Sequence, residues 1–137
     1  MLTSVGFLYL KNVKGFDEHA LLEATKAFYQ IPMEERQKLV WHNHDARNKN
    51  IFRGLTPFIS NSEAHKEFFD MGRKSFSESE QKYPIVEETP FLPDKKYQWI
   101  KETLEKQWSL MHKVALKLAK YIAIGLGKPE DIFLPWF

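Results

Sequence analysis

Apolar and polar positions follow each other most regularly in the last third of the chain. From Tyr97 to Gly125, apolar or small residues recur every three or four positions, as on one face of an α-helix. Asp94 precedes this run and Gly127 follows it, so we predict one long support helix over about residues 94–126. At 1.5 Å per residue it would span about 45 Å. Its predicted apolar face comprises Tyr97, Ile100, Leu104, Trp108, Met111, Ala115, Leu118, Ile122 and Gly125.

Two shorter helices are predicted in the first third. Asp17 can accept a hydrogen bond as an N-cap, and apolar residues then recur at helical spacing to about Gln30. Pro32 suits the first position of a second helix, because it has no N–H to leave unpaired. That helix should run to about Val40.

Strands are predicted to be few. The short apolar run 5–10 (VGFLYL) is typical of a strand buried on both faces. Residues 41–50 and 75–81 are polar and aperiodic, which indicates loops, and prolines 84, 90 and 93 favour extended backbone between them. The predicted fold class is therefore mainly α with one or two short strands (α+β).

Composition narrows the class of protein. The 137 residues suit a single domain, 1–137, and a net charge of +2 with mixed signs offers no basic face for nucleic acid. The absence of cysteine excludes a disulfide framework, a zinc knuckle and a thiol nucleophile. No targeting segment or apolar run of membrane-spanning length is present. We expect a cytoplasmic protein without a membrane or nucleic-acid partner.

The stretch 53–58 (RGLTPF), with 66–72 (KEFFDMG) behind it, combines an arginine, turn formers and aromatics. Positioned irregular segments often carry binding groups. Arg53 lies among apolar residues and needs a carbonyl or anionic partner, which Glu67, Asp70 or a substrate could supply. The aromatic residues nearby suit a core better than a substrate pocket. They are Phe52, Phe58, Phe68, Phe69, Phe76 and Tyr83.

Two motifs could hold a metal ion and a third could hold a keto acid, and we favour none of them. Residues 42–45 (HNHD) group two imidazoles and a carboxylate, but a polar loop gives them no rigid frame. His65 and Glu67 have the spacing of two ligands of a facial triad, and Arg73 with Ser75 could hold a keto acid. No histidine lies between Glu67 and Arg73 to complete that triad, so we predict no metal ligand and no catalytic residue here.

Six segments, taken in chain order, form a further pattern. They match segments written GFFYLVNHG, FF-LP-EEK-KL, RGYTP, KE-FD-G, WP and LALGL-PEDFF. On this match the chain resembles the non-haem iron(II), 2-oxoglutarate-dependent dioxygenases of the isopenicillin-N-synthase-like group. The segments are 6–12 (GFLYLKN), 28–39 (FYQIPMEERQKL), 53–58 (RGLTPF), 66–72 (KEFFDMG), 83–84 (YP), and 118–126 (LAKYIAIGL) with 129–133 (PEDIF).

The resemblance implies the N-terminal, largely helical region of such an enzyme, whose long helix supports a catalytic double-stranded β-helix. The family's iron ligands and 2-oxoglutarate-binding residues lie in that later domain, which this chain does not include. Fe(II) and 2-oxoglutarate are thus expected for the complete enzyme alone. The chain departs from the family at Leu55, where a tyrosine is usual, and at Val13, where a histidine is usual. The family's opening strand and helix also have no counterpart before Met1.

The expected function is a structural part of a 2-oxoglutarate/Fe(II)-dependent oxidoreductase that contributes to the pocket for a small organic substrate. By this resemblance Arg53, Leu55 and Phe58 lie near the pocket, and the chain is not catalytic alone. Its expected partner is the missing catalytic domain. The alternative is a stand-alone helical module that binds a protein through its aromatic surface. Coding sequence downstream of Phe137 would separate the two.

Overall fold

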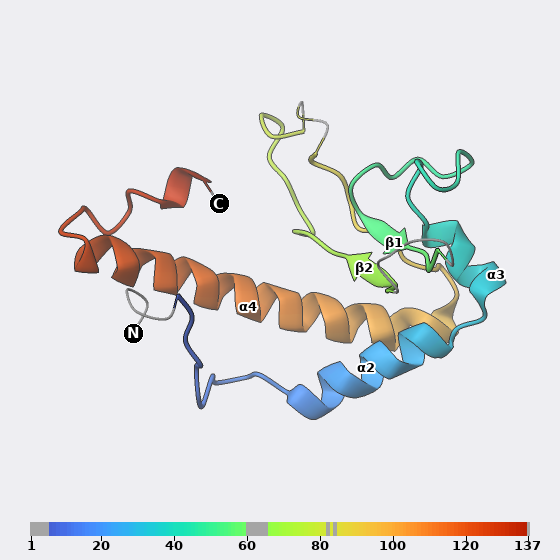
Figure 1. The fold of residues 1–137 in the computed structure, drawn as a ribbon, viewed down its shortest axis with the longest axis horizontal. Coiled ribbons are helices and arrows are strands. Elements are labelled where there is room, and N and C mark those ends of the chain that lie inside the picture. The colour runs from blue at the N-terminus through green and yellow to red at the C-terminus, as the bar shows by residue number, and fades with distance from the viewer. Residues whose placement is uncertain (1–5, 60–65, 82, 84, 137) are drawn as a thin grey trace.

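One long helix forms the axis of the fold (Figure 1). In the computed structural model, which describes residues 6–59, 66–81, 83 and 85–136, α4 covers Gln98–Gly125. A 3-10 turn, η2 (Lys95–Tyr97), precedes it, and the Asp94 carboxylate accepts a hydrogen bond from the Lys96 N–H at 3.0 Å. A last 3-10 turn, η3 (Leu134–Trp136), follows α4 and contacts it. The helix therefore occupies the residues where the apolar spacing predicts one.

The first helix, α2 (Glu18–Gln30), packs along the first half of α4 (Figure 1). Asp17 is its N-cap, as predicted, and accepts from the Ala20 N–H at 2.9 Å. The Asp17 N–H in turn reaches the side-chain oxygen of Gln107, a buried residue of α4, at 3.5 Å. Burial of Ala24 and Phe28 supplies the apolar contact between the helices.

The second predicted helix is confirmed, with a different internal geometry. It comprises α3 (Met33–Arg36) and then one 3-10 turn, η1 (Gln37–Leu39). Pro32 is the N-cap and not the first helical residue. The loop that follows is fastened to this end, because the Asn48 side chain donates to the carbonyl oxygens of Gln37 and Val40 at 2.9 and 2.8 Å. The Gln37 carbonyl also accepts from the Val40 N–H at 3.2 Å, so the asparagine adds a second hydrogen bond at this helix end.

Two short strands form from stretches that the sequence shows as irregular. β1 (Gly54–Thr56) and β2 (Phe68–Asp70) pair antiparallel, with Leu55 opposite Phe69. An isolated parallel bridge joins Val40 to Leu55. Strands of three residues are too short to show an alternating pattern, which is why the sequence did not predict them. The fold class, mainly α with short strands, is confirmed.

The predicted strand over residues 5–10 is wrong for the part that the structure describes. Residues 6–10 make no strand pairing, and the rings of Phe7 and Tyr9 are 61% and 86% exposed. A strand needs the N–H and C=O groups of a neighbour, and none of the described residues supplies them here. Val5 lies outside the described residues.

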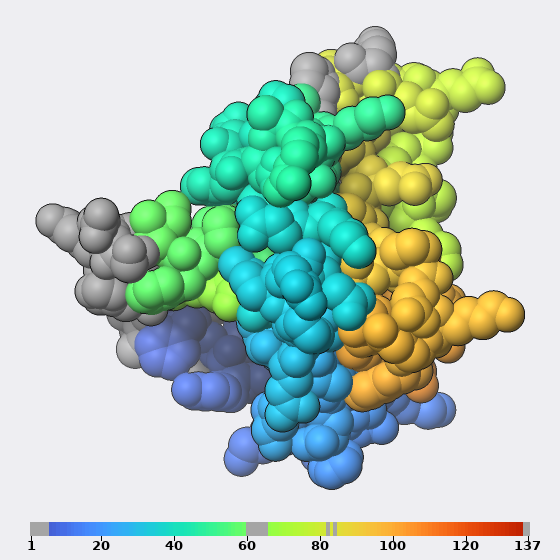
Figure 2. Space-filling view, turned by 90° about the vertical axis from the view of Figure 1, so that its right-hand side faces the viewer, coloured from blue at the N-terminus to red at the C-terminus, as the bar shows by residue number. Residues whose placement is uncertain are grey.

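The hydrophobic core lies where α2, η1, β1 and the start of α4 meet. Figure 2 looks onto this end, with α3 and η1 (cyan) in the centre, α2 (blue) below and the residues around 90–100 (orange) beside them. We call it the packed end. Its buried members are Ala24, Phe28, Ile31, Leu39, Val40, Leu55, Leu92 and Ile100.

The apolar stripe of α4 is buried over only part of its length. Ile100 is 3% exposed beside α2, whereas Met111 and Ile122 on the same predicted face are 45% and 40% exposed. Further along, the buried residues are Ala119 and Ala123. On the predicted face Leu118 is half-buried, whereas Met111 and Ile122 are exposed, because α2 covers only the first half of the helix. No helix in the described part of the chain is long and apolar enough to span a membrane.

Candidate functional site

The Arg53 side chain reaches across β2. Its Nη1 donates to the Met71 carbonyl at 2.9 Å, so the predicted need for a carbonyl partner is met within the chain. The guanidinium lies so close to Gly72 that a Cβ at this position would overlap it. Glu67, one of the carboxylates that could have paired with Arg53, instead pairs with Arg36.

Hydrogen bonding of the guanidinium is incomplete. Arg53 Nε is buried and has no hydrogen-bond partner among the described residues. Most buried donors in folded proteins find an acceptor, so such a group needs an explanation. Arg53 is thus fixed in place and keeps unused donor capacity.

A single carboxylate holds the backbone that leads into β1. Glu87 accepts from three consecutive N–H groups: Ile51 at 2.9 Å, Phe52, and Arg53 at 2.5 Å. Backbone amides that converge in this way form a concave anion-binding nest, here occupied by a side chain of the same protein. The segment before β1 is therefore positioned by a residue more than 30 positions later in the sequence.

Neighbouring contacts fix the other groups of the same segment. The Asn50 side chain donates to the Arg53 carbonyl at 2.5 Å, and the Gly72 N–H donates to Thr89 Oγ1 at 3.0 Å. Gly54 adopts φ +116°, and a Cβ there would collide with the Leu39 carbonyl oxygen. Only glycine adopts this geometry readily, so the chain can pass close to η1 at this point.

The three predicted pocket residues occupy different environments. Arg53 is half-buried, Leu55 is 0% exposed inside the core, and the Phe58 ring is 51% exposed. Leu55 can therefore influence a pocket only through the position of β1. Of the other aromatics, Phe69 packs against the core, while Phe52 and Tyr83 are exposed, so the predicted core role is wrong for those two.

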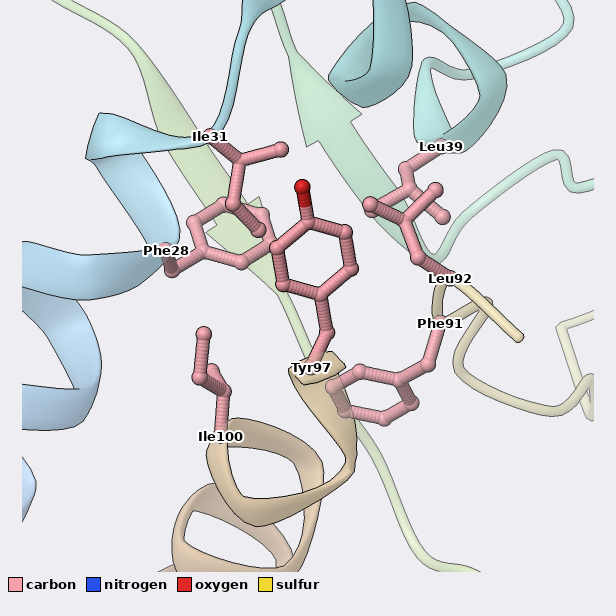
Figure 3. A pocket seen from close by; sticks show the side chains of 7 residues that line it. All are labelled: Phe28, Ile31, Leu39, Phe91, Leu92, Tyr97 and Ile100. Atoms are coloured by element: carbon pink, nitrogen blue, oxygen red, sulfur yellow. The ribbon is translucent and has the colours of Figure 1, made fainter. Parts of the chain in front are cut away.

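The apolar cavity at the packed end is too small for a substrate. Its volume is about 10 Å³, roughly the size of one water position. Figure 3 shows rings and aliphatic side chains from the end of α2 and its C-cap, η1, the 91–92 segment, η2 and the start of α4 converging on it. Ligand pockets are typically 300 Å³ or larger, so this cavity is a packing gap in the core. The lining residues are Phe28, Ile31, Leu39, Phe91, Leu92, Tyr97 and Ile100.

Two other arginines near the site, Arg36 and Arg73, form ion pairs within the chain. Arg36 pairs with Glu67, donates from Nε to the Ile31 carbonyl at 2.9 Å and lies 5.6 Å from the centre of the Tyr29 ring. Burial raises the pKa of the Tyr29 phenol, and the nearby Glu67 carboxylate adds to that effect. Arg73, which could have held a keto acid, pairs with Glu80.

The histidine-containing loop is organised by its own contacts. His42 Nδ1 donates to the Asn48 carbonyl at 2.7 Å, and Asp45 accepts from the Arg47 guanidinium at 2.8 Å. The hydrogen bonds from Arg47 hold the pKa of the Asp45 carboxyl well below its usual range. Among the described residues, no three histidine or carboxylate side chains are grouped to hold a metal ion. His65 lies outside those residues.

Sequence reasoning missed Glu87, Asn50 and Thr89. Glu87 lies in a proline-punctuated segment, and nothing in its local sequence distinguishes it from Glu88. The three residues become important because the fold brings residues 87–89 beside both strands. A cluster of asparagines before Arg53 was visible, but it indicated only a loop.

Exposed apolar side chains gather along the second half of α4 and at the two ends of the described chain. α4 continues well past α2 in Figure 1, and residues 6–16 run below that extension. Single exposed apolar residues are normal, but a concentration of them marks a contact surface. We call this the open apolar set: Phe7, Tyr9, Leu10, Met111, Tyr121, Ile122, Ile124, Leu126 and Ile132.

Comparisons with known proteins identify relatives of the chain by sequence. Residues 1–95 match the family model described as the N-terminal domain of the non-haem dioxygenase in morphine synthesis. The isopenicillin N synthase of Amycolatopsis lactamdurans is 25% identical over 95% of this chain. The chain spans about 40% of that relative's length. No solved structure matches the chain.

Proposed function

Because the chain belongs to the family of non-haem dioxygenase N-terminal domains, we propose that it supports the catalytic domain of a 2-oxoglutarate- and Fe(II)-dependent oxidoreductase. In this proposal the catalytic β-helix domain lies outside these 137 residues and holds both cofactors. The chain itself supplies a scaffold and part of the pocket wall for a small organic substrate. The resemblance in 53–58 and 66–72 supports the wall, and the open apolar set supports the scaffold.

The observation that carries the proposal is the change of environment along α4. Ile100 and Ile122 share one predicted face, yet only the first is buried. Burying an exposed aliphatic side chain contributes about 1.5–3 kcal/mol, so a surface of several such residues favours a covering partner. The relative, of which the chain matches about 40%, has sequence to spare for such a domain.

Coding sequence and metal binding test this proposal together. We expect the reading frame beyond Phe137 to encode a His-x-Asp motif in an alternating β pattern. In calorimetric titrations with Fe(II), the complete protein should bind the metal, whereas residues 1–137 alone should not bind it tightly. A stop codon at that point would favour the stand-alone interaction module, and tight Fe(II) binding by residues 1–137 would contradict the division of roles.

Arg53 and Phe58 are the residues we propose for the pocket wall, with Leu55 anchoring β1 between them. The unpaired Nε of Arg53 and the exposed ring of Phe58 support this assignment. Replacing Arg53 by Ala in the complete enzyme should weaken substrate binding, measured as KM for the organic substrate that supports turnover. Arg47→Ala is the matched control, because Arg47 is an exposed arginine paired within its own loop. Unchanged turnover and affinity in Arg53→Ala would remove the assignment.

A further inference from the structure

We infer that Glu87 is a positioning residue: it holds Arg53 in place in the proposed wall of the substrate pocket. The inference rests on the proposed function, since it concerns the same part of the pocket. Nothing in the local sequence singles out Glu87, and its role follows from three N–H groups that converge on one carboxylate. We call these contacts the Glu87 clasp.

The clasp acts on Arg53 directly. The Arg53 N–H donates to Glu87, its carbonyl accepts from Asn50, and its Nη1 donates to Met71. Both backbone polar groups and one end of the side chain are thus fixed. A side chain held at several points loses less conformational entropy when it binds a ligand, which is how supporting residues improve a site.

This positioning role needs a carboxylate, because a carboxylate is a strong hydrogen-bond acceptor. Glu87 Oε1 accepts from all three amides and Oε2 accepts from Ile51 as well, and hydrogen bonds to a charged acceptor are roughly twice as strong as neutral ones. A glutamine keeps one oxygen, which is uncharged and therefore a weaker acceptor, and with that oxygen in the place of Oε1 its NH₂ group would face the Ile51 N–H. Glu87→Gln therefore preserves size and weakens the clasp.

The adjacent glutamate provides a matched control. Glu88 is exposed and accepts no hydrogen bond from the described residues, although it lies on the same segment. Glu88→Gln makes the same chemical change one residue away. A difference between the two variants reports the clasp and not the loss of one negative charge.

The first experiment measures the clasp itself. Hydrogen exchange by NMR on the complete protein should show the amides of residues 51–53 exchanging about 10-fold faster in Glu87→Gln than in the wild type, because their acceptor becomes an uncharged and weaker one. In Glu88→Gln their exchange should be unchanged. Equal exchange in all three proteins would overturn the inference.

The second experiment asks whether the clasp acts through Arg53. In the complete enzyme, Glu87→Gln should raise KM for the organic substrate about 10-fold with little change in kcat, since misplacement of a wall residue weakens binding. In an Arg53→Ala background the same change should raise KM no further. Additive effects of the two substitutions, or a loss confined to kcat, would contradict a positioning role.

The two failures can be told apart. If Arg53→Ala leaves KM unchanged, Arg53 is not part of the pocket wall. The positioning role of Glu87 is then rejected as well, whatever the exchange rates show. If Arg53→Ala raises KM but Glu87→Gln does not, the wall stands and the role of Glu87 is overturned. Circular dichroism and the melting temperature of each variant establish that it is folded before either comparison is made.

Discussion

The packed end and the second half of α4 are built from similar residues and have opposite surroundings. Leu55 at the packed end is 0% exposed, whereas Ile124 on α4 is 54% exposed. At the packed end, segments distant in sequence close over each other: residues 87–92 lie against β1, and α2 lies against α4. Beyond Met111, α4 buries Ala119 and Ala123 but leaves Tyr121, Ile122 and Ile124 exposed.

This difference teaches that an apolar stripe identifies a contact surface and leaves its partner unspecified. The spacing from Tyr97 to Gly125 is continuous, so it predicts one uninterrupted buried face. Within the chain, α2 covers that face only as far as its own 13 residues reach. We propose that the catalytic domain covers the remaining apolar positions.

Removing Arg36 should break the packed end most severely. Arg36→Ala deletes a buried cation that pairs with Glu67 and donates to the Ile31 carbonyl. Leaving one partner of a buried pair uncompensated costs about 3–5 kcal/mol, so we expect a loss of about 4 kcal/mol in the free energy of unfolding, measured with urea. Lys38→Ala, an exposed neighbour, should change it by less than about 0.5 kcal/mol. Similar losses for both variants would be inconsistent with the buried pair.

Matched truncations compare the two regions directly. Leu55→Ala should cost about 3 kcal/mol, because it leaves a cavity in a closed core. Ile124→Ala in the same 137-residue chain should cost less than about 0.5 kcal/mol, since the side chain is largely hydrated already. Urea denaturation measures both, and equal costs would break the comparison. Repeating Ile124→Ala in the complete protein should give a larger loss if the catalytic domain covers this face.

Two glycine substitutions should act in opposite directions. Gly54→Ala should destabilise the chain by about 2 kcal/mol, because φ is positive and the Leu39 carbonyl occupies the space for a Cβ. Gly125 is the last residue of α4, and no atom lies within 4 Å of a Cβ built there. Gly125→Ala should therefore stabilise the chain by about 0.5–1 kcal/mol through helix propensity. Melting temperatures show whether each variant is more or less stable than the wild type. A stabilising effect of Gly54→Ala would contradict the close contact between Gly54 and the Leu39 carbonyl.

The smallest expected effect is a pH dependence at the edge of the packed end. Hydrogen bonds from Arg73 and then from Ser77 lower the pKa of Glu80 from 4.5 to about 2. Since the folded-state pKa is below the unfolded value, the contribution is complete above pH 4.5 and is lost as the pH falls toward 2. Glu80→Gln should lower the melting temperature at pH 6, and the gap to the wild type should narrow by pH 2. If the difference in melting temperature is the same at both pH values, the ionised Glu80 carboxylate does not contribute to stability.

Helices were predictable from the sequence because their signals are local. The Asp17 cap, the proline before α3 and the long periodic run each lie within a few residues of the structure that they determine. The strands depend on each other, since β1 exists only where β2 lies beside it. Residues 6–10 have the composition of a strand but no such neighbour in the described chain. Pairing is therefore the part of the fold that local pattern could not supply.

At the candidate site, the sequence identified Arg53 and its need for a carbonyl or anionic partner, but not which one. The Met71 carbonyl becomes available only after β2 forms, and Gly72 admits the guanidinium because it lacks a side chain. Glu87 could not be found because its function depends on a separation of 34–36 residues. The pocket roles of Arg53, Leu55 and Phe58 stay predictions for the complete enzyme to test.

The hydrogen bond between the Asp17 N–H and Gln107 also has a consequence for biosynthesis. Its two residues are 90 positions apart, and α2 has its main helical contact with α4. At roughly 5–20 residues per second, a ribosome needs about 5–18 s to add those positions. During that interval the apolar face of α2 is without its cover. Slow codons between α2 and α4 would lengthen this exposure of the nascent chain.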